Sequence, residues 1–147
     1  MKILLKNGMV VSGNGSKKQD VLIQDGIIME VSDSILASDA EQVDVTGKIL
    51  FPGFIDAHTH FDLEVSNTIT ADNFATGTKA AILGGTTMII DFATQNKGET
   101  LTEALRNWHR KADGVSSCDY GFHMAISDWN AQTEKDLSVM FEQGVSS

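Results

Sequence analysis

Hydrophobic residues in the first third of the chain come in short runs that are separated by turn signals. Three pairs of turn residues, Asn7-Gly8, Asp25-Gly26 and Thr46-Gly47, each lie between two such runs. Asn-Gly and Asp-Gly pairs between apolar runs favour tight turns whose twist matches that of two antiparallel strands. The pattern therefore predicts a small antiparallel β module over residues 1–50.

From residue 51 onward, apolar runs of strand length alternate with segments that have helical spacing of their apolar residues. The predicted strands are 54–58, 86–92 and 119–126, and the predicted helices are about 72–83, 101–113 and 131–143. The middle strand is an unbroken apolar run except for its threonines and Asp91, which predicts burial on both faces.

Each predicted helix carries start or stop signals and one apolar face. Asp72 is a good N-cap residue, Thr100 and Glu103 have the spacing of a capping box, and glycines follow all three helices. The residues expected to face the core are Phe74, Thr78, Ala81 and Ile82 in the first helix, Leu101, Ala104, Leu105, Trp108 and Ala112 in the second, and Leu137, Met140 and Phe141 in the third.

The predicted strands begin about 33 residues apart, which is the repeat of strand–helix units that build parallel sheets. The α/β class follows, and a (β/α)8 barrel is the commonest closed arrangement of such units. A barrel typically takes about 250 residues, so three units in residues 51–147 predict an incomplete piece of a longer protein. A doubly wound open sheet is the alternative, although no Gly-rich nucleotide loop follows the first strand.

Composition narrows the class of protein. The 147 residues carry a net charge of -9 and one cysteine, Cys118. An acidic chain disfavours nucleic acid or an anionic membrane as partner, because both attract basic patches. A lone cysteine cannot form an internal disulfide, and the chain shows neither a signal peptide nor a membrane span. These features predict a cytoplasmic protein.

The strongest chemical signal is the run Asp56-Ala57-His58-Thr59-His60 at the end of the first strand after residue 50. Residues i and i+2 of a strand point to the same face, so His58 and His60 can direct both imidazoles at one metal ion. Asp56 or Asp62 could bond to the other ring nitrogen of a ligating histidine.

For two other ionisable residues on the predicted strands, a structural role is favoured over a role in the metal site. His123 lies within the third strand, where a structural hydrogen bond is favoured over metal ligation. Asp91 ends the second strand and could reach the catalytic mouth at the carboxyl ends of the barrel strands. A hydrogen bond to a neighbouring loop is its favoured role.

Several stretches resemble the dihydropyrimidinase/D-hydantoinase family of the amidohydrolase superfamily. The opening of the barrel, residues 51–60, is similar to the superfamily motif. The stretches 70–74, 84–92 and 120–130 resemble the hydantoinase family specifically, and the last is quite specific. The resemblance covers essentially the whole chain.

The resemblance implies a (β/α)8 barrel beside a small β-sandwich, of which residues 1–50 would form one part. It implies two divalent metal ions, usually zinc, with His58 and His60 binding the more buried one. The bridging ligand of the family is a carboxylated lysine, expected just beyond Ser147 because residues 144–147 match the start of its motif. The remaining ligands and the catalytic aspartate are also expected beyond that point, so no catalytic residue lies within the 147 residues. The family is usually tetrameric.

By resemblance, the activity is metal-dependent hydrolysis of cyclic amides, converting hydantoins and dihydropyrimidines to N-carbamoyl amino acids. Phe61 and Leu63 match the segment that lines the substrate pocket. The 147 residues alone are expected to be inactive. The alternatives are an allantoinase-like cyclic ureide hydrolase and a non-catalytic scaffold related to dihydropyrimidinase. A dihydroorotase is disfavoured, because the run after His60 lacks the arginine that would hold a substrate carboxylate.

Overall fold

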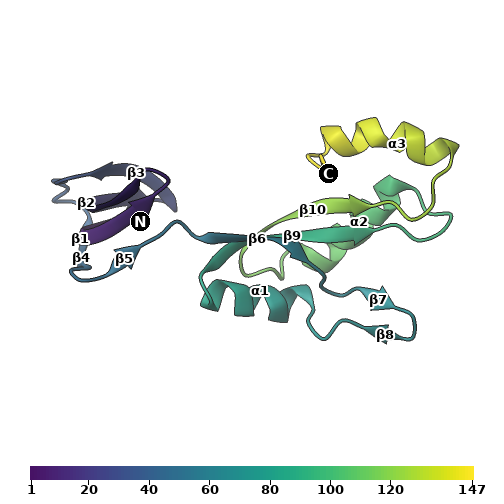
Figure 1. Ribbon diagram of the computed structural model, residues 1–147, viewed down its shortest axis with the longest axis horizontal. Coiled ribbons are helices and arrows are strands. Elements are labelled where there is room, and N and C mark those ends of the chain that lie inside the picture. The colour runs from purple at the N-terminus through teal and green to yellow at the C-terminus, as the bar shows by residue number, and fades with distance from the viewer. The chain divides into compact units, whose positions relative to one another are not determined.

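The computed structural model describes all 147 residues. They divide into two compact units, Met1–Pro52 and Gly53–Ser147, where the sequence predicted a boundary after residue 50. The first unit consists of strands, and the second alternates strands with helices (Figure 1). None of the helices is long and apolar enough to cross a membrane.

The first unit is a mixed β-sheet and not the purely antiparallel module that we predicted. Its strands are β1 (Lys2–Ser12), β2 (Gly15–Gln24), β3 (Ile27–Ser32), β4 (Glu41–Asp44) and β5 (Ile49–Leu50). The order is β3-β2-β1-β4, and β5 also pairs with β1. The pairs β1–β2 and β2–β3 are antiparallel, whereas β4 and β5 both run parallel to β1.

Only one of the three predicted turns forms a hairpin. Asp25 and Gly26 connect β2 to β3 with φ values of 51° and 83°, as a tight hairpin turn requires. Asn7-Gly8 instead lies inside β1, where the pairing with β2 shifts register, so it forms a β-bulge. Thr46-Gly47 lies between β4 and β5, which both run along β1 in the same direction.

The second unit is built on a parallel sheet with the strand order β10-β9-β6. Its elements are β6 (Phe54–Thr59), β7 (Glu64–Val65), β8 (Thr68–Ile69), α1 (Phe74–Leu83), β9 (Thr86–Thr94), α2 (Leu101–Ala112), β10 (Asp119–Ala125) and α3 (Ala131–Glu142). The short strands β7 and β8 pair in a hairpin of their own. Each long strand is followed by a helix, as predicted.

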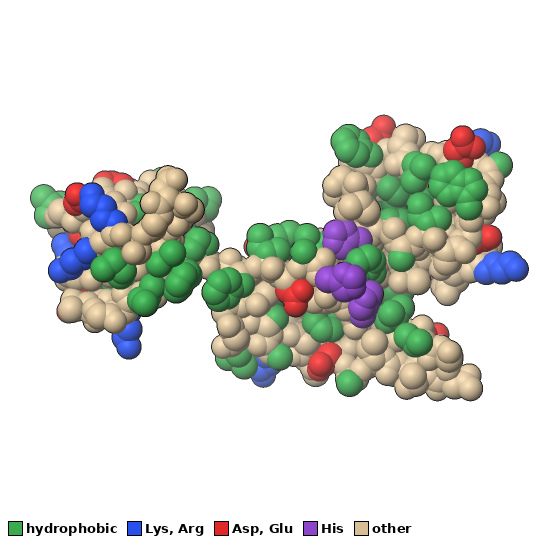
Figure 2. Space-filling model, viewed as in Figure 1, with side chains coloured by type: hydrophobic (Ala, Val, Ile, Leu, Met, Phe, Trp, Pro, Cys, Tyr) green, Lys and Arg blue, Asp and Glu red, His purple; other side chains and the backbone are tan.

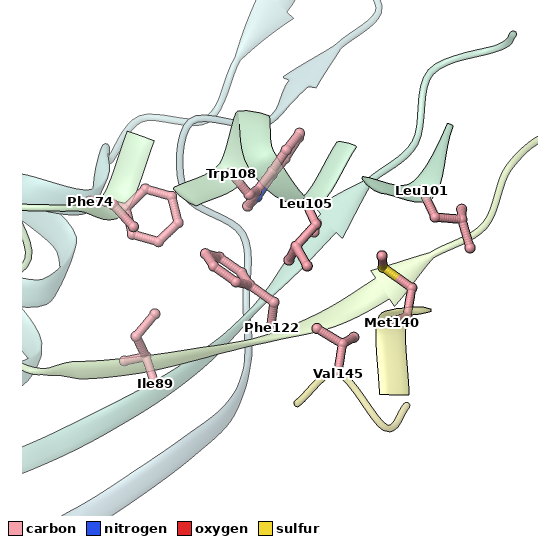
Figure 3. Packing of buried hydrophobic residues seen from close by; sticks show 10 residues of the cluster. Phe74, Ile89, Leu101, Leu105, Trp108, Phe122, Met140 and Val145 are labelled. Atoms are coloured by element: carbon pink, nitrogen blue, oxygen red, sulfur yellow. The ribbon is translucent and has the colours of Figure 1, made fainter. Parts of the chain in front are cut away.

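The sheet of the second unit has one face covered by helices and one open face. Ile89, Asp91 and Ala93 of β9 are buried, while the residues between them are only partly buried. Burial of β9 on both faces was therefore a wrong prediction for this chain. Figure 3 shows Ile89 and Phe122 of the sheet in one cluster with side chains of the helices.

The predicted apolar face is correct for α2 and only partly correct for the other helices. The five residues predicted to be buried in α2 are the five that the structure buries, and Thr100 forms the capping box with Glu103. The N-cap of α1 is Asn73 and not Asp72. Ile82, at the edge of the α1 face, is 38% exposed.

Helix α3 packs differently from the prediction. Met140 is buried, but Leu137 and Phe141 are 41% and 73% exposed. The buried polar residue Asp136 takes part in the contact instead, because its Oδ2 accepts a hydrogen bond from the backbone N–H of Leu101 at 3.0 Å. This carboxylate satisfies a free donor in the first turn of α2, which fixes the face that α3 presents.

Candidate metal centre

His58 and His60 lie at the carboxyl end of β6 and are both exposed. Figure 2 shows a group of histidine side chains on one face of the second unit. Thr59, between the two histidines, points the other way and bonds to Asp91 on the helix-covered side of the sheet. The alternation of the strand therefore places both imidazoles on the same face, as predicted, and this face is the open one.

The two imidazoles are spaced as two ligands of one metal ion would be. Their Nε2 atoms are 3.3 Å apart. Two nitrogens bound to one zinc ion at about 2.0–2.1 Å and at a tetrahedral angle would be about 3.3 Å apart. The residues present therefore fit a divalent metal. No third His, Cys, Asp or Glu joins them as a candidate ligand in this structure.

Phe92 of β9 forms a shared apolar floor beneath the histidines. Its ring centroid lies 4.6 Å from that of His58 and 5.0 Å from that of His60. A third histidine, His123 of β10, packs on the same ring at 4.8 Å. Contact with the Phe92 ring blocks one side of each imidazole and so limits the orientations that the two exposed rings can take.

A β-bulge in β6 lies directly at the histidine pair. Asp56 pairs with Ile89 and Thr59 with Asp91, so β6 contains one residue more than β9 over this interval. A bulge releases backbone groups from the ladder and redirects side chains. Both Asp56 and His123 bond to backbone groups of this bulge.

The released carbonyl and N–H groups are satisfied by side chains. His123 Nε2 lies 3.0 Å from the carbonyl oxygen of Ala57, and its Nδ1 lies 2.6 Å from Ser147 Oγ. Asp56 Oδ1 accepts a hydrogen bond from the backbone N–H of His58 at 3.1 Å. His123 thus has the structural role that the sequence favoured, with both ring nitrogens engaged.

The two aspartates proposed to orient the histidine rings bond to backbone groups instead. Asp56 holds the N–H of His58 and not its imidazole. Asp62 Oδ2 accepts a hydrogen bond from the N–H of Phe74, at the start of α1, at 3.2 Å. Lys111 donates to the carbonyl oxygen of Asp62 at 2.7 Å, which ties the loop after His60 to α2.

Phe61 and Leu63, the predicted substrate contacts, have different surroundings. The Phe61 ring packs edge-on against Phe74 at 5.6 Å, and it lies directly against Gly77. Leu63 lines a pocket of about 350 Å³ together with Trp108 and Lys111. Of the two, Leu63 is therefore the one that faces a pocket.

The sequence did not predict two features of the site: the bond of Asp91 to α2 and the position of the Phe92 ring beneath the histidines. Asp91 is fully buried and bonds to the segment after β6, as favoured, but it also bonds to α2. A signal for this was present, because Asp91 shares its side of the strand with Ile89 and Ala93. A lone charge on a buried face requires partners that satisfy it.

Comparison with known proteins shows the family to which the chain belongs. A sequence model described as "Amidohydrolase family" matches residues 49–145. The chain is similar to a D-hydantoinase of Geobacillus stearothermophilus, with 45% identity over 148 residues, which is 100% of this chain and 31% of the relative. It is also similar to a dihydropyrimidinase of Dictyostelium discoideum, with 44% identity over 99% of this chain and 29% of the relative.

A solved structure shows the same likeness. The crystal structure of dihydropyrimidinase from Brevibacillus agri matches with a TM-score of 0.93 and 45% identity, over 99% of this chain and 32% of that chain. The chain thus spans about a third of the length of its relatives. The resemblance to the dihydropyrimidinase/D-hydantoinase group that the sequence indicated is confirmed. By the match over residues 49–145, this chain belongs to the amidohydrolase family.

Proposed function

We propose that this chain supplies two histidine ligands to the metal centre of a cyclic-amide hydrolase. The substrates would be hydantoins and dihydropyrimidines, and the products N-carbamoyl amino acids. One observation carries the proposal: the Nε2 atoms of His58 and His60 are 3.3 Å apart at the carboxyl end of a parallel strand. The names of the similar proteins, D-hydantoinase and dihydropyrimidinase, support the substrate class.

The residues of this chain would hold and orient the metal. The neutral imidazoles of His58 and His60 would each offer an Nε2 lone pair, on a floor formed by the Phe92 ring. Asp56 would keep the backbone of His58 in place through its N–H. A pair of divalent ions, when bound, would supply an activated water at neutral pH and polarise the amide carbonyl.

The proposal extends to the whole protein. The strands β6, β9 and β10, with α1, α2 and α3, would be the first three units of a (β/α)8 barrel. The metals would be zinc, bridged by a carboxylated lysine beyond Ser147. The protein would act in the cytoplasm as a tetramer. Parallel strands in chain order, each followed by a helix, support the barrel.

Metal binding by the chain tests the histidine pair directly. We expect isothermal titration with ZnCl2 to show binding to the 147-residue chain, and His58→Gln or His60→Gln to abolish the heat of binding. His109→Gln is the matched control, because His109 is a partly exposed histidine of α2 that bonds to Asp113. Equal zinc binding by all four proteins would refute the role of the pair.

A chimera tests the reaction. Residues 1–147 would replace the matching segment of the Geobacillus stearothermophilus D-hydantoinase, to which they are 45% identical. We expect the zinc-loaded chimera to hydrolyse hydantoin and dihydrouracil faster than allantoin, and the His58→Gln chimera to be inactive. A preference for allantoin would favour the ureide alternative. A folded, zinc-loaded chimera without any hydrolysis would favour a scaffold.

A further inference from the structure

Asp91 is a fully buried carboxylate that makes four hydrogen bonds. Its Oδ2 accepts from the hydroxyl of Thr59 and the backbone N–H of Phe61, both at 2.9 Å. Its Oδ1 accepts from the backbone N–H of Phe92, the next residue, at 2.9 Å and from Trp108 Nε1 at 3.1 Å. All four partners donate, so the side chain acts only as an acceptor. A carboxylate is suited to this, because both of its oxygens accept hydrogen bonds.

The two partners of Oδ2 flank His60 in the sequence. Thr59 precedes His60 and Phe61 follows it, so one carboxylate oxygen holds the chain on both sides of this histidine. Asp91 itself lies on the helix-covered side of the sheet, opposite the imidazoles. It therefore fixes the backbone from which the His60 side chain projects, without touching the ring.

The other oxygen of Asp91 serves a different part of the molecule. Through Trp108 it bonds to α2, which packs on β9 and β10. Hydrogen bonds to an ionised acceptor are roughly twice as strong as neutral ones, and buried networks of them are rigid. The two oxygens thus allow the effect on His60 to be separated by mutation from the effect on the helix.

We propose that Asp91 is a positioning residue for the metal ligand His60, acting through Thr59 and Phe61; this rests on the proposed function of His58 and His60. By holding both flanking residues, Asp91 keeps the Nε2 atoms of His60 and His58 at the spacing that one metal ion requires, before the metal binds. Preorganised ligands bind more tightly, because less conformational freedom is lost on binding.

Three variants separate this role from simple stabilisation of the fold. Thr59→Val removes the hydroxyl and keeps the shape of the side chain, whereas Thr59→Ser keeps the hydroxyl. Trp108→Phe removes the bond to Oδ1 and leaves the two bonds to Oδ2 intact. In zinc titrations we expect Thr59→Val to weaken the affinity by about 10-fold, the lower end for residues that orient metal ligands. Thr59→Ser and Trp108→Phe should bind zinc as the unaltered chain does.

A second measurement needs no metal. Asp91→Asn replaces one acceptor oxygen by an amide that donates, so it cannot accept all four hydrogen bonds. We expect the Phe61 amide proton to lose protection from hydrogen exchange in Asp91→Asn and to keep it in Trp108→Phe.

The outcomes distinguish this proposal from the proposed function. Zinc binding that is lost in His58→Gln but equal in Thr59→Val and the unaltered chain would overturn the positioning role and leave the proposed function intact. Equal losses of affinity in Thr59→Val, Thr59→Ser and Trp108→Phe would also overturn it, because they would indicate general destabilisation. No zinc binding by the unaltered chain would overturn both proposals.

Discussion

Two buried aspartates, one in each unit, show how the partners of a carboxylate set its role. Asp91 has four uncharged donors and links two strands to a helix. Asp20 of β2 accepts backbone N–H bonds from Asn7 at 2.9 Å and Ile35 at 3.1 Å, and it lies 3.5 Å from Lys6 Nζ. The bond from Asn7 stabilises the bulge in β1, at the position where a turn was predicted.

The hydrogen bond from Asn7, joined by that from Ile35 and by the charge of Lys6, holds the pKa of Asp20 below its usual value, although burial acts in the opposite direction. A pKa that is lower in the folded state stabilises the fold above the unfolded pKa, and this stabilisation is lost as the pH falls through the folded pKa. We expect Asp20→Asn to lower the free energy of unfolding by about 2 kcal/mol at pH 7.

Urea denaturation followed by circular dichroism checks this prediction. The difference between Asp20→Asn and the unaltered chain should shrink below pH 4, near the ordinary pKa of 3.8 for this group. Asp33→Asn is the control, because Asp33 pairs with Lys17 in an exposed salt bridge. It should change stability much less. A difference that stays constant from pH 7 to pH 3 would contradict the role given to the Asp20 charge.

At the scale of elements, the close contact between α1 and the loop after β6 is a sensitive packing feature next to the histidine pair. Gly77 lies inside α1, and a Cβ added there would lie 2.3 Å from a ring atom of Phe61. Phe61 follows His60 directly and bonds to Asp91 through its N–H. A displacement of Phe61 would therefore reach the backbone of His60, the proposed metal ligand.

We expect Gly77→Ala to destabilise the second unit, against the usual rule for helices. Alanine in place of glycine inside a helix gains about 1 kcal/mol, but overpacking of this kind costs typically 1–3 kcal/mol. Gly84→Ala is the control, since its Cβ would meet only two backbone oxygens, at 3.4 and 3.6 Å. Thermal unfolding should show a lower Tm for Gly77→Ala than for Gly84→Ala. The reverse order would show that the Phe61 ring yields freely.

At the scale of the whole molecule, the chain would contribute one part of the proposed metal site. Two imidazoles share a face, and no third candidate ligand lies with them within residues 1–147. Hydrolytic zinc sites generally use three protein ligands and an open position for water.

We therefore expect the purified 147-residue chain with added ZnCl2 to hydrolyse neither hydantoin nor dihydrouracil. The assay would follow the absorbance of the cyclic substrate and the formation of the N-carbamoyl product by chromatography. The chimera with the remainder of the D-hydantoinase is the positive control. Turnover by the chain alone that is lost in His58→Gln would contradict this expectation and place a complete site within residues 1–147.

Features that depend on neighbours in the sequence could be predicted from the sequence alone. The hairpin at Asp25-Gly26, the capping box and buried face of α2, and the shared direction of His58 and His60 all follow from local backbone geometry. These signals need only the conformational preferences of consecutive residues and the periodicity of helices and strands.

Other features depended on contacts between distant segments. The bulge at Asn7 forms where Asp20, 13 residues away, accepts its N–H. The face of α3 depends on a hydrogen bond that Asp136 accepts from the first turn of α2. The bulge at His58, the Phe92 floor and the bonds of Asp91 on either side of His60 arise only when β6, β9 and β10 lie side by side. A buried polar group is stable only with a partner, and folding brings that partner from elsewhere in the chain.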